Sequence, residues 1–215
     1  MNTDGILNKN NPAKTASRKG NLIRAAFLDR DGVINKDKEY LFRWDDFEYI
    51  PGAIEALQLL TNDPSVLVVI TTGQSGIGRG KYSECDFQLL TNKMTNDLLQ
   101  KCIYIDGVWY CPHLPHKERH KAIEPYNQKC TCRKPQTGLI DAARDHFRSQ
   151  GMEIDLASSC VFGDKTADVK MGENAGCRTV LVGTGYAGKE SRDQYPINPD
   201  YRAKNLLDGV RWWLG

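Results

Sequence analysis

Residues 25–35 read AAFLDRDGVIN, and this stretch decides the fold class. Its first part is apolar and does not alternate with polar residues, which is typical of a strand buried on both faces of a parallel sheet. The strand ends in two carboxylates, Asp29 and Asp31, and Gly32 follows where the chain turns. Acids at the end of a buried strand cost free energy unless a ligand or a metal compensates for their burial. We therefore expect a functional edge here, although a solvated acidic turn explains so short a motif equally well on its own.

The rest of the chain alternates strand-like and helix-like patterns. Strands are predicted over 23–29, 66–72, 105–111, 159–164 and 179–185, and helices over 53–62, 83–102, 138–150 and 168–176. Ser83 is a predicted N-cap, and a short C-terminal helix is expected to dock Trp212 and Trp213 on the body. The alternation predicts an α/β fold in which helices cover both faces of a mostly parallel central sheet.

Length and composition limit the class of protein. The 215 residues suit one domain, placed at residues 21–215, and the polar residues 1–20 are expected to form a flexible tail or to be an expression remnant. A net charge of +2 argues against nucleic-acid and membrane partners, and no apolar run approaches the roughly 18 residues of a membrane span. Residues 1–20 also lack the apolar core of a secretory signal, so we expect a cytoplasmic protein whose seven cysteines form no disulfide framework.

Acidic and hydroxyl side chains stand where predicted strands end. Asp29, Thr72 and Asp164 each occupy the carboxyl end of a strand, and ligands of parallel α/β sheets bind beyond that edge. Carboxylates as close as Asp29 and Asp31 repel each other unless a cation lies between them, and Mg²⁺ prefers such oxygen ligands. Asp168 would face the same site from the first turn of a helix, where the helix dipole also favours an acid without any ligand.

Two further segments carry groups that suit a phosphate. The loop after Thr72 has three glycines within residues 73–78, and its uncovered amides would bind an oxyanion, unless the loop is merely flexible. Arg133 and Lys134 would add the positive charge that phosphoryl transfer needs, although a basic pair of this kind is ordinarily exposed.

Residues 110–135 contain two tight pairs of metal-ligand residues, Cys111 with His113 and Cys130 with Cys132. Three thiolates and one imidazole make the closed tetrahedral set of a structural zinc site. The alternative is ordinary thiols beside a surface histidine. Two more histidines of the segment are spare candidates for the nitrogen ligand: His116 and His120. Zinc would stabilise a segment with few apolar residues and would fix the basic pair that follows Cys132.

Taken together, these motifs resemble a known family. DRDG (29–32), Thr72 before a glycine-rich loop, Lys134, and GDKTAD (163–168) are similar, in that order, to the four motifs of the haloacid dehalogenase (HAD) superfamily of phosphohydrolases. The resemblance extends from about residue 25 to residue 188. It implies a Rossmann-like three-layer sandwich. No segment of the chain is large enough to form a separate cap domain.

The resemblance also implies aspartyl-phosphate chemistry. Asp29 would be the nucleophile, and Asp31 would protonate the leaving group and then activate water. Mg²⁺ would be held by Asp29, by Asp164 and by the backbone carbonyl of Asp31. Asp168 would orient the catalytic lysine or a metal-bound water. Two residues would stabilise the phosphoryl oxygens: Thr72 and Lys134.

A narrower resemblance, to the heptose-bisphosphate phosphatases and the related histidinol-phosphatases, rests on DRDGVIN, QSGIGRG, CPH, CxCRKP and GDK. The 16 residues between His113 and Cys130 are similar to the long loop of the heptose enzymes. The chain departs from the family at Gly73, where Asn is usual, and at Glu39, where Gly is usual. By position, the substrate contacts of the family fall on six residues: Asp37, Tyr40, Gln74, Ser75, Arg133 and Lys165.

The function that this resemblance implies is hydrolysis of the 7-phosphate of a heptose 1,7-bisphosphate by a monomeric, Mg²⁺-dependent phosphatase with a structural zinc ion. Two alternatives stay within the enzymes, a histidinol-phosphatase and a phosphatase for another small sugar phosphate. A third is a zinc-stapled binding module that has lost catalysis. The preferred anomer, and whether the product feeds lipopolysaccharide or another glycoconjugate, are left open.

Overall fold

The computed structural model describes Ile6 and residues 22–191 and 193–215. The tail expected over residues 1–20 therefore lies outside the described residues, apart from Ile6. That residue forms an antiparallel bridge with Val108 and packs against the core at the edge of the sheet.

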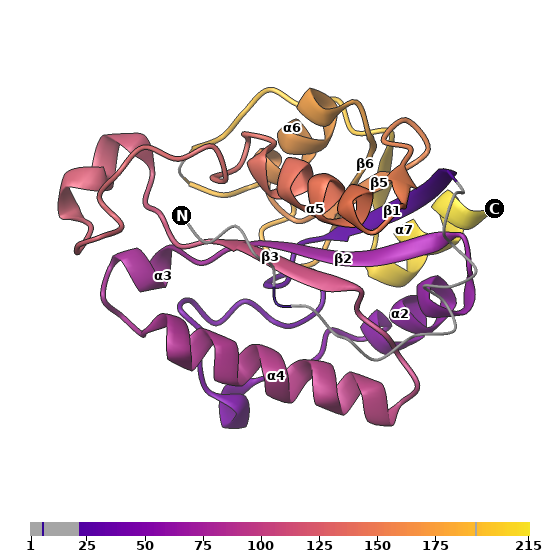
Figure 1. Ribbon diagram of the computed structural model, residues 1–215, viewed down its shortest axis with the longest axis horizontal. Coiled ribbons are helices and arrows are strands. Elements are labelled where there is room, and N and C mark those ends of the chain that lie inside the picture. The colour runs from indigo at the N-terminus through magenta and orange to yellow at the C-terminus, as the bar shows by residue number, and fades with distance from the viewer. Residues whose placement is uncertain (1–5, 7–21, 192) are drawn as a thin grey trace.

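One sheet organises the described part of the chain (Figure 1). Its strands follow the order β3-β2-β1-β5-β6-β7, and β4 pairs with the start of β1. Every one of these strand pairings is parallel, as the strand–helix alternation predicts. The strands are β1 Leu22–Leu28, β2 Val66–Gly73, β3 Gly107–Cys111, β4 Glu153–Ile154, β5 Cys160–Gly163, β6 Arg178–Val182 and β7 Tyr201–Ala203.

Helices cover both faces of the sheet, which confirms the three-layer prediction. Helices α5 and α6 pack on one face, and α2, α4 and α7 pack on the other (Figure 1). Along β1, Ala25 and Phe27 belong to the first core layer and Ala26 and Leu28 to the second, because successive strand residues point to opposite faces. The helices are α2 Ala53–Asn62, α3 Ser75–Gly78, α4 Glu84–Gln100, α5 Gly138–Ser149, α6 Thr166–Ala175 and α7 Leu206–Leu214.

The observed elements differ from the predicted ones mainly at their ends and in short pieces. The strand predicted over 179–185 ends at Val182, and the helix predicted over 168–176 begins at Thr166. Ser83 is confirmed as an N-cap, because its hydroxyl accepts a hydrogen bond from the Asp86 amide at 3.1 Å. Five elements are too short to show a periodicity and were not predicted. These are α3, β4, β7 and the 3-10 turns η1 Trp44–Asp46 and η2 His116–Lys121.

The C-terminal helix docks on the body, as expected. The buried ring of Trp213 meets Phe162 edge-on with ring centres 5.9 Å apart. The ring of Trp212 stacks on Tyr201 with a centre distance of 4.9 Å. Aromatic contacts therefore attach α7 to β5 and β7.

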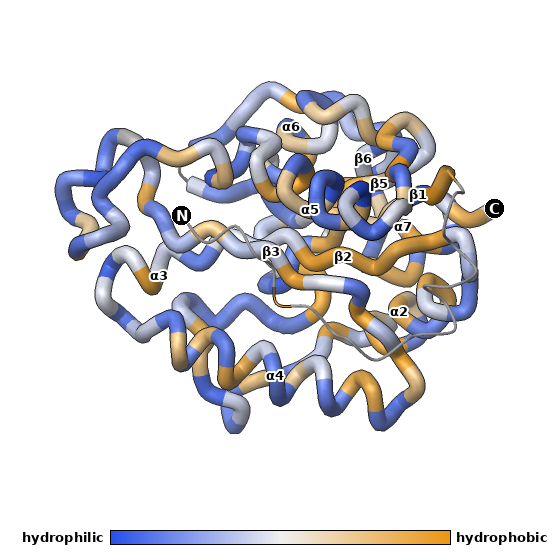
Figure 2. Tube along the Cα trace, viewed as in Figure 1, coloured by the Kyte–Doolittle hydropathy of each residue, from blue (hydrophilic) through white to orange (hydrophobic). Residues whose placement is uncertain are grey.

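The carboxyl ends of the strands lie together at one edge of the sheet. The irregular segment after β3 extends from that edge, to the left in Figure 1, and most of it is hydrophilic, in contrast to the apolar β2 (Figure 2). The edge that carries the strand ends is thus the part of the molecule where a polar site can form.

Within the described ranges, each helix is too short or too polar to cross a membrane.

Candidate active site

Three buried acids meet at the carboxyl edge of the sheet. Asp29 follows β1, Asp164 follows β5, and Asp168 lies in the first turn of α6. One carboxylate oxygen from each lies within 4.8 Å of the other two. Because β1 and β5 are neighbours in the sheet, the strand ends bring Asp29 and Asp164 together as the sequence predicts.

Lys134 supplies positive charge among these acids. Its Nζ lies 3.1 Å from Asp29 Oδ1 and 2.5 Å from Asp168 Oδ1, and its side chain is only 9% exposed. Burial alone would lower the pKa of Lys134, but the charges of Asp168 and Asp29 raise the pKa above its ordinary value. Lys134 is therefore a buried ammonium group, and a surface position for it is excluded. Asp168 also accepts the Lys165 amide at 3.0 Å, so it fixes Lys134 to the start of α6.

Asp164 is the acid best placed to hold a cation. Its Oδ2 accepts the Tyr186 amide at 2.7 Å, while its Oδ1 is buried without a hydrogen-bond partner among the described residues. Burial raises the pKa of Asp164 well above its ordinary value and that of Asp29 to about 6. Gly32, with a φ of 88°, passes so close that a Cβ would lie 2.5 Å from Asp164 Oδ2. A buried carboxylate with a free oxygen fits a divalent cation, which would offset the cost of its charge.

The Asp31 carboxylate is held apart from this cluster. Arg30 Nη2 lies 2.9 Å from Asp31 Oδ2, and the side-chain amides of Asn35 and Gln74 donate to the carboxylate at 2.8 and 3.0 Å. Burial would raise the pKa of Asp31, but the charge of Arg30 and these hydrogen bonds outweigh it and lower the pKa. The guanidinium of Arg30 is thus a cation beside the Asp31 carboxylate, and a metal ion between the Asp29 and Asp31 side chains stays a prediction. Metal binding by the Asp31 backbone carbonyl stays a prediction.

Gln74 connects Asp31 to Thr72. Its Nε2 donates to Thr72 Oγ1 at 2.9 Å, and the Tyr82 hydroxyl donates to its Oε1 at 2.5 Å. The side chain of Gln74 is buried, and through its hydrogen bonds it positions the side chains of Asp31 and Thr72. Ser75 comes next, as the first residue of α3. Substrate contacts by Gln74 and Ser75 stay predictions.

The glycine-rich segment after β2 forms the helical turn α3 instead of an open loop. The amide of Gln74 donates to the Cys111 carbonyl at 2.7 Å, and the amide of Gly78 donates to the Pro112 carbonyl at 3.1 Å. These amides are occupied, so the predicted oxyanion nest is wrong for them. Gly73 differs, because a Cβ there would meet no atom within 4 Å. The space that an Asn side chain would occupy at this position is open.

On one flank of the acids, the predicted substrate residues Asp37 and Lys165 form an ion pair. Lys165 Nζ lies 3.4 Å from Asp37 Oδ2 and 4.7 Å from the ring centre of Tyr186. Glu39 and Tyr40 follow with φ values of 48° and 55°. A positive φ favours glycine, so the backbone at Glu39 fits the expectation that glycine is usual at this position. Asp37, Glu39 and Tyr186 line a hollow of about 580 Å³.

The four predicted zinc ligands form one cluster. Cys111 ends β3, and its Sγ lies 3.6 Å from His113 Nδ1 and 3.9 Å from Cys130 Sγ. Cys132 Sγ lies 3.4 Å from the same Nδ1, and one ligand atom from each of the four lies within 4.8 Å of the others. The cysteines are free thiols, and burial raises the pKa of Cys111 well above its ordinary value. One nitrogen and three sulfurs at these spacings fit a tetrahedral zinc ion, which would stabilise the thiolates.

The nitrogen atom of that cluster belongs to His113. Of the two spare histidines, His120 is exposed and lies outside the cluster, and the side chain of His116 lies outside the described part of the chain. Arg133 Nη1 donates to the His113 carbonyl at 3.0 Å, and Lys134 is two residues after Cys132. The Cys/His cluster thereby positions the basic pair, as the sequence suggests.

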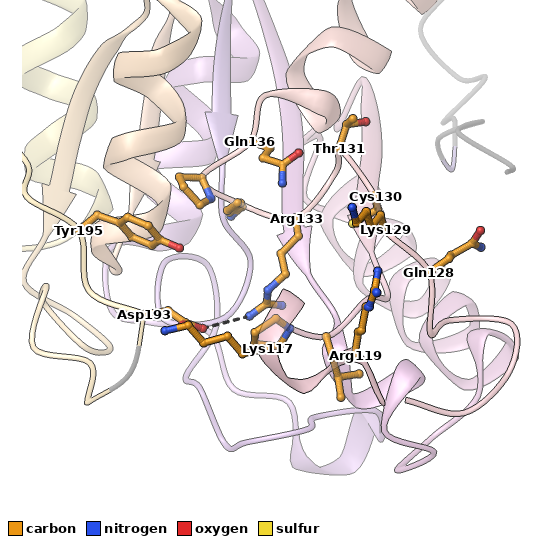
Figure 3. A pocket seen from close by; sticks show the side chains of 14 residues that line it. Lys117, Arg119, Gln128, Lys129, Cys130, Thr131, Arg133, Gln136, Asp193 and Tyr195 are labelled. Carbon is orange, nitrogen blue, oxygen red and sulfur yellow. Dashed lines mark ion pairs between the residues drawn. The ribbon is translucent and has the colours of Figure 1, made fainter. Parts of the chain in front are cut away.

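A groove of about 580 Å³ lies between this cluster and residues 193–195 (Figure 3). Arg133 extends toward Asp193, with 3.8 Å between Nη2 and Oδ2. The groove is also lined by three cations that the sequence analysis did not select: Lys117, Arg119 and Lys129. The sequence could have indicated these three cations through the many basic residues between the two ligand pairs. Arg30, Asn35 and Tyr186 were not predicted as site residues either. Only their closeness in the sequence to motif residues could have indicated them.

Comparison with known proteins assigns the chain to a family. A family model described as HAD-hydrolase-like matches residues 131–209. A D-glycero-beta-D-manno-heptose-1,7-bisphosphate 7-phosphatase of Escherichia coli K12 is 40% identical over 189 residues, which cover 87% of this chain and 88% of that protein. This chain belongs to the heptose-bisphosphate phosphatase family of HAD-like hydrolases. It is therefore a phosphoric monoester hydrolase.

Other members of the HAD-like phosphatases agree with this assignment. A D-glycero-alpha-D-manno-heptose-1,7-bisphosphate 7-phosphatase of Photorhabdus laumondii is 42% identical over 79% of this chain and 88% of its own length. The crystal structure of the D,D-heptose 1,7-bisphosphate phosphatase from B. bronchiseptica, complexed with magnesium and phosphate, has a TM-score of 0.71 at 29% identity. That superposition covers 89% of this chain and 98% of the B. bronchiseptica chain. The relatives thus include enzymes named for either anomer of one sugar.

Proposed function

We propose that this phosphatase removes the 7-phosphate of D-glycero-D-manno-heptose 1,7-bisphosphate. The observation that carries the proposal is the buried cluster of Asp29, Asp164 and Lys134 at the carboxyl edge of the sheet. Such a cluster combines a nucleophile, a cation site and a fixed positive charge, which are the parts that phosphoryl transfer requires. The names of relatives at 40 and 42% identity supply the substrate.

Asp29 is the nucleophile of this reaction. One of its carboxylate oxygens bonds to phosphorus, and the bond from phosphorus to the sugar oxygen breaks. Asp31 gives its proton to the leaving alkoxide and later takes a proton from the water that cleaves the aspartyl-phosphate. The products are inorganic phosphate and the free Asp29 carboxylate. Arg30 favours the ionised form of Asp31, and an entering phosphate dianion favours the protonated form that the first step needs.

Two further residues stabilise the phosphoryl oxygens. Lys134 is already fixed next to Asp29, and Thr72 is held by Gln74 at the end of β2. Their positions need no rearrangement during the reaction, so they lower the barrier through positioning and charge.

Mg²⁺ is the proposed catalytic cofactor. Asp29 and Asp164 would hold it with the backbone carbonyl of Asp31, and the partnerless Asp164 Oδ1 supports this ligand set. A bound Mg²⁺ supplies neutralisation of the phosphate charge. Zinc is proposed at the four-ligand Cys/His cluster, where it would have a structural role.

Steady-state kinetics test the proposal. We expect kcat/KM to be highest for heptose 1,7-bisphosphate, measured for both anomers, and lower for histidinol phosphate. Activity should stop in EDTA and return on addition of Mg²⁺ alone. Faster turnover of histidinol phosphate would overturn the substrate assignment, and full activity in EDTA would overturn the metal assignment.

A further inference from the structure

The segment between β6 and β7 holds a buried glutamate against the start of α6. Glu190 is 6% exposed, and its Oε1 accepts the Thr166 amide at 2.7 Å and also accepts the Thr166 hydroxyl. Thr166 is the first residue of α6, where a backbone amide has no acceptor within the helix. Glu190 thus satisfies the helix N-terminus from another segment of the chain, and the helix dipole favours a carboxylate at that end.

Two further hydrogen bonds brace this contact. Gln194 Nε2 donates to the Glu190 carbonyl at 2.5 Å, and the Tyr195 amide donates to Thr166 Oγ1 at 3.0 Å. Glu190 Oε2, by contrast, is buried without a hydrogen-bond partner among the described residues. Burial of a carboxylate that uses one of its two oxygens costs free energy, so the attachment of a loop is not a sufficient reason for it.

The first turn of α6 carries a residue of the active site. Asp168 lies in this turn, accepts the Lys165 amide at 3.0 Å, and holds Lys134 Nζ at 2.5 Å from its Oδ1. The turn also packs tightly on the sheet, because a Cβ at Gly163 would lie 2.1 Å from the Cβ of Asp168. The place of the Lys134 ammonium group, 3.1 Å from Asp29 Oδ1, therefore depends on where α6 begins.

We propose that Glu190 is a positioning residue for phosphoryl transfer: it fixes the first turn of α6 and, through Asp168, holds Lys134 beside Asp29. The inference rests on the proposed function for the roles of Asp29 and Lys134. Glu190 lies just beyond residue 188, where the family resemblance ends. A shift of about 1 Å at a reacting centre costs up to about 100-fold in rate, so the loss of this anchor is expected to lower kcat.

The test compares Glu190→Ala with Glu190→Gln on p-nitrophenyl phosphate, a substrate that does not depend on the sugar assignment. Glu190→Ala removes the acceptor of the Thr166 amide, and we expect kcat to fall about tenfold with KM within about twofold of wild type. Glu190→Gln keeps an acceptor oxygen, and Oε2 has no partner to lose, so kcat should stay within about threefold. The control Glu55→Ala removes an exposed acid from the first turn of α2 and should change neither constant.

A role in stability alone is separated by a second background. Asp168→Asn weakens the link to Lys134, so Glu190→Ala should lower the kcat of that variant by less than about twofold further. Hydrogen exchange should become faster at the Thr166 amide of Glu190→Ala, with no general increase across the strands of the sheet.

Three results would overturn the inference: wild-type kcat in Glu190→Ala, the same tenfold loss in both backgrounds, or equal losses in Glu190→Ala and Glu190→Gln. A failure of the proposed function is seen separately, as wild-type kcat in Lys134→Met. In that case hydrogen exchange at the Thr166 amide still tests whether Glu190 fixes the start of α6.

Discussion

The catalytic edge and the cationic groove share Lys134 but are built in opposite ways. At the edge, Asp29, Asp164 and Asp168 are buried, and strand ends or a helix start fix them. In the groove, Lys117 and Lys129 are exposed on a segment without strands. The comparison indicates that the sheet fixes the acids of the site, while the segment between the Cys/His pairs places cations beside them.

The largest effect is expected at the edge. Asp29→Asn keeps the shape of the side chain and removes the nucleophile, so kcat should fall by about 10⁴-fold or more. The melting temperature should change by only a few degrees, because Lys134 keeps Asp168 as its partner. Asp45→Asn, at an acid that is 81% exposed, is the control and should keep wild-type kcat. A kcat of Asp29→Asn close to that of the wild type would refute the nucleophile assignment.

A smaller effect is expected where the two regions join. Cys111→Ser should lose zinc and reduce kcat/KM by about 10- to 100-fold, because Arg133 and Lys134 lose their support. Cys111 is buried at the end of β3, so Cys132→Ser provides a second, less buried variant of the same cluster. Cys85→Ser, at an exposed free thiol on α4, should keep both zinc and activity. Metal analysis and kinetics measure the two effects. A variant that lacks zinc but keeps the kcat/KM of the wild type would contradict this prediction.

The smallest effect is expected within the edge itself, at Gln74. Gln74→Leu removes the amide that holds Asp31 and Thr72, and we expect about a tenfold loss of kcat on sugar phosphates, where the leaving alkoxide needs a proton. The loss should be less on p-nitrophenyl phosphate, whose leaving group needs none. Gln100→Leu, at an exposed residue that ends α4, is the control. An equal loss on both substrates would show that Gln74 does not act through Asp31.

The strand ends were predictable because their signal is local. The runs that end at Asp29, Thr72 and Asp164 are apolar and continuous, and parallel pairing necessarily gathers their carboxyl ends at one edge. The two pairs Cys111/His113 and Cys130/Cys132 were also predictable, because two tight pairs of soft ligands in one segment are rare by chance.

The rest depends on tertiary contacts that no local pattern carries. Asp31 and Asp29 are two residues apart, yet only the fold shows that Arg30 and Gln74 hold the Asp31 carboxylate apart from the acid cluster. The loop after Thr72 has the composition of an open loop, but the carbonyl of Cys111 on the adjacent strand accepts one of its amides. In the sequence, Lys117, Arg119 and Lys129 resemble ordinary exposed basic residues. Only the fold shows that they line one groove with Lys134 and Asp193.

The claim on which the account depends is that the Asp29 carboxylate bonds to phosphorus. In the Asp31→Asn variant, cleavage of the phosphoenzyme should be slow, while p-nitrophenyl phosphate still transfers its phosphoryl group. We predict a rapid, stoichiometric burst of nitrophenol, and borohydride reduction of the quenched enzyme should convert residue 29, and no other carboxylate, to homoserine. Turnover without a burst and without homoserine at position 29 would contradict the account.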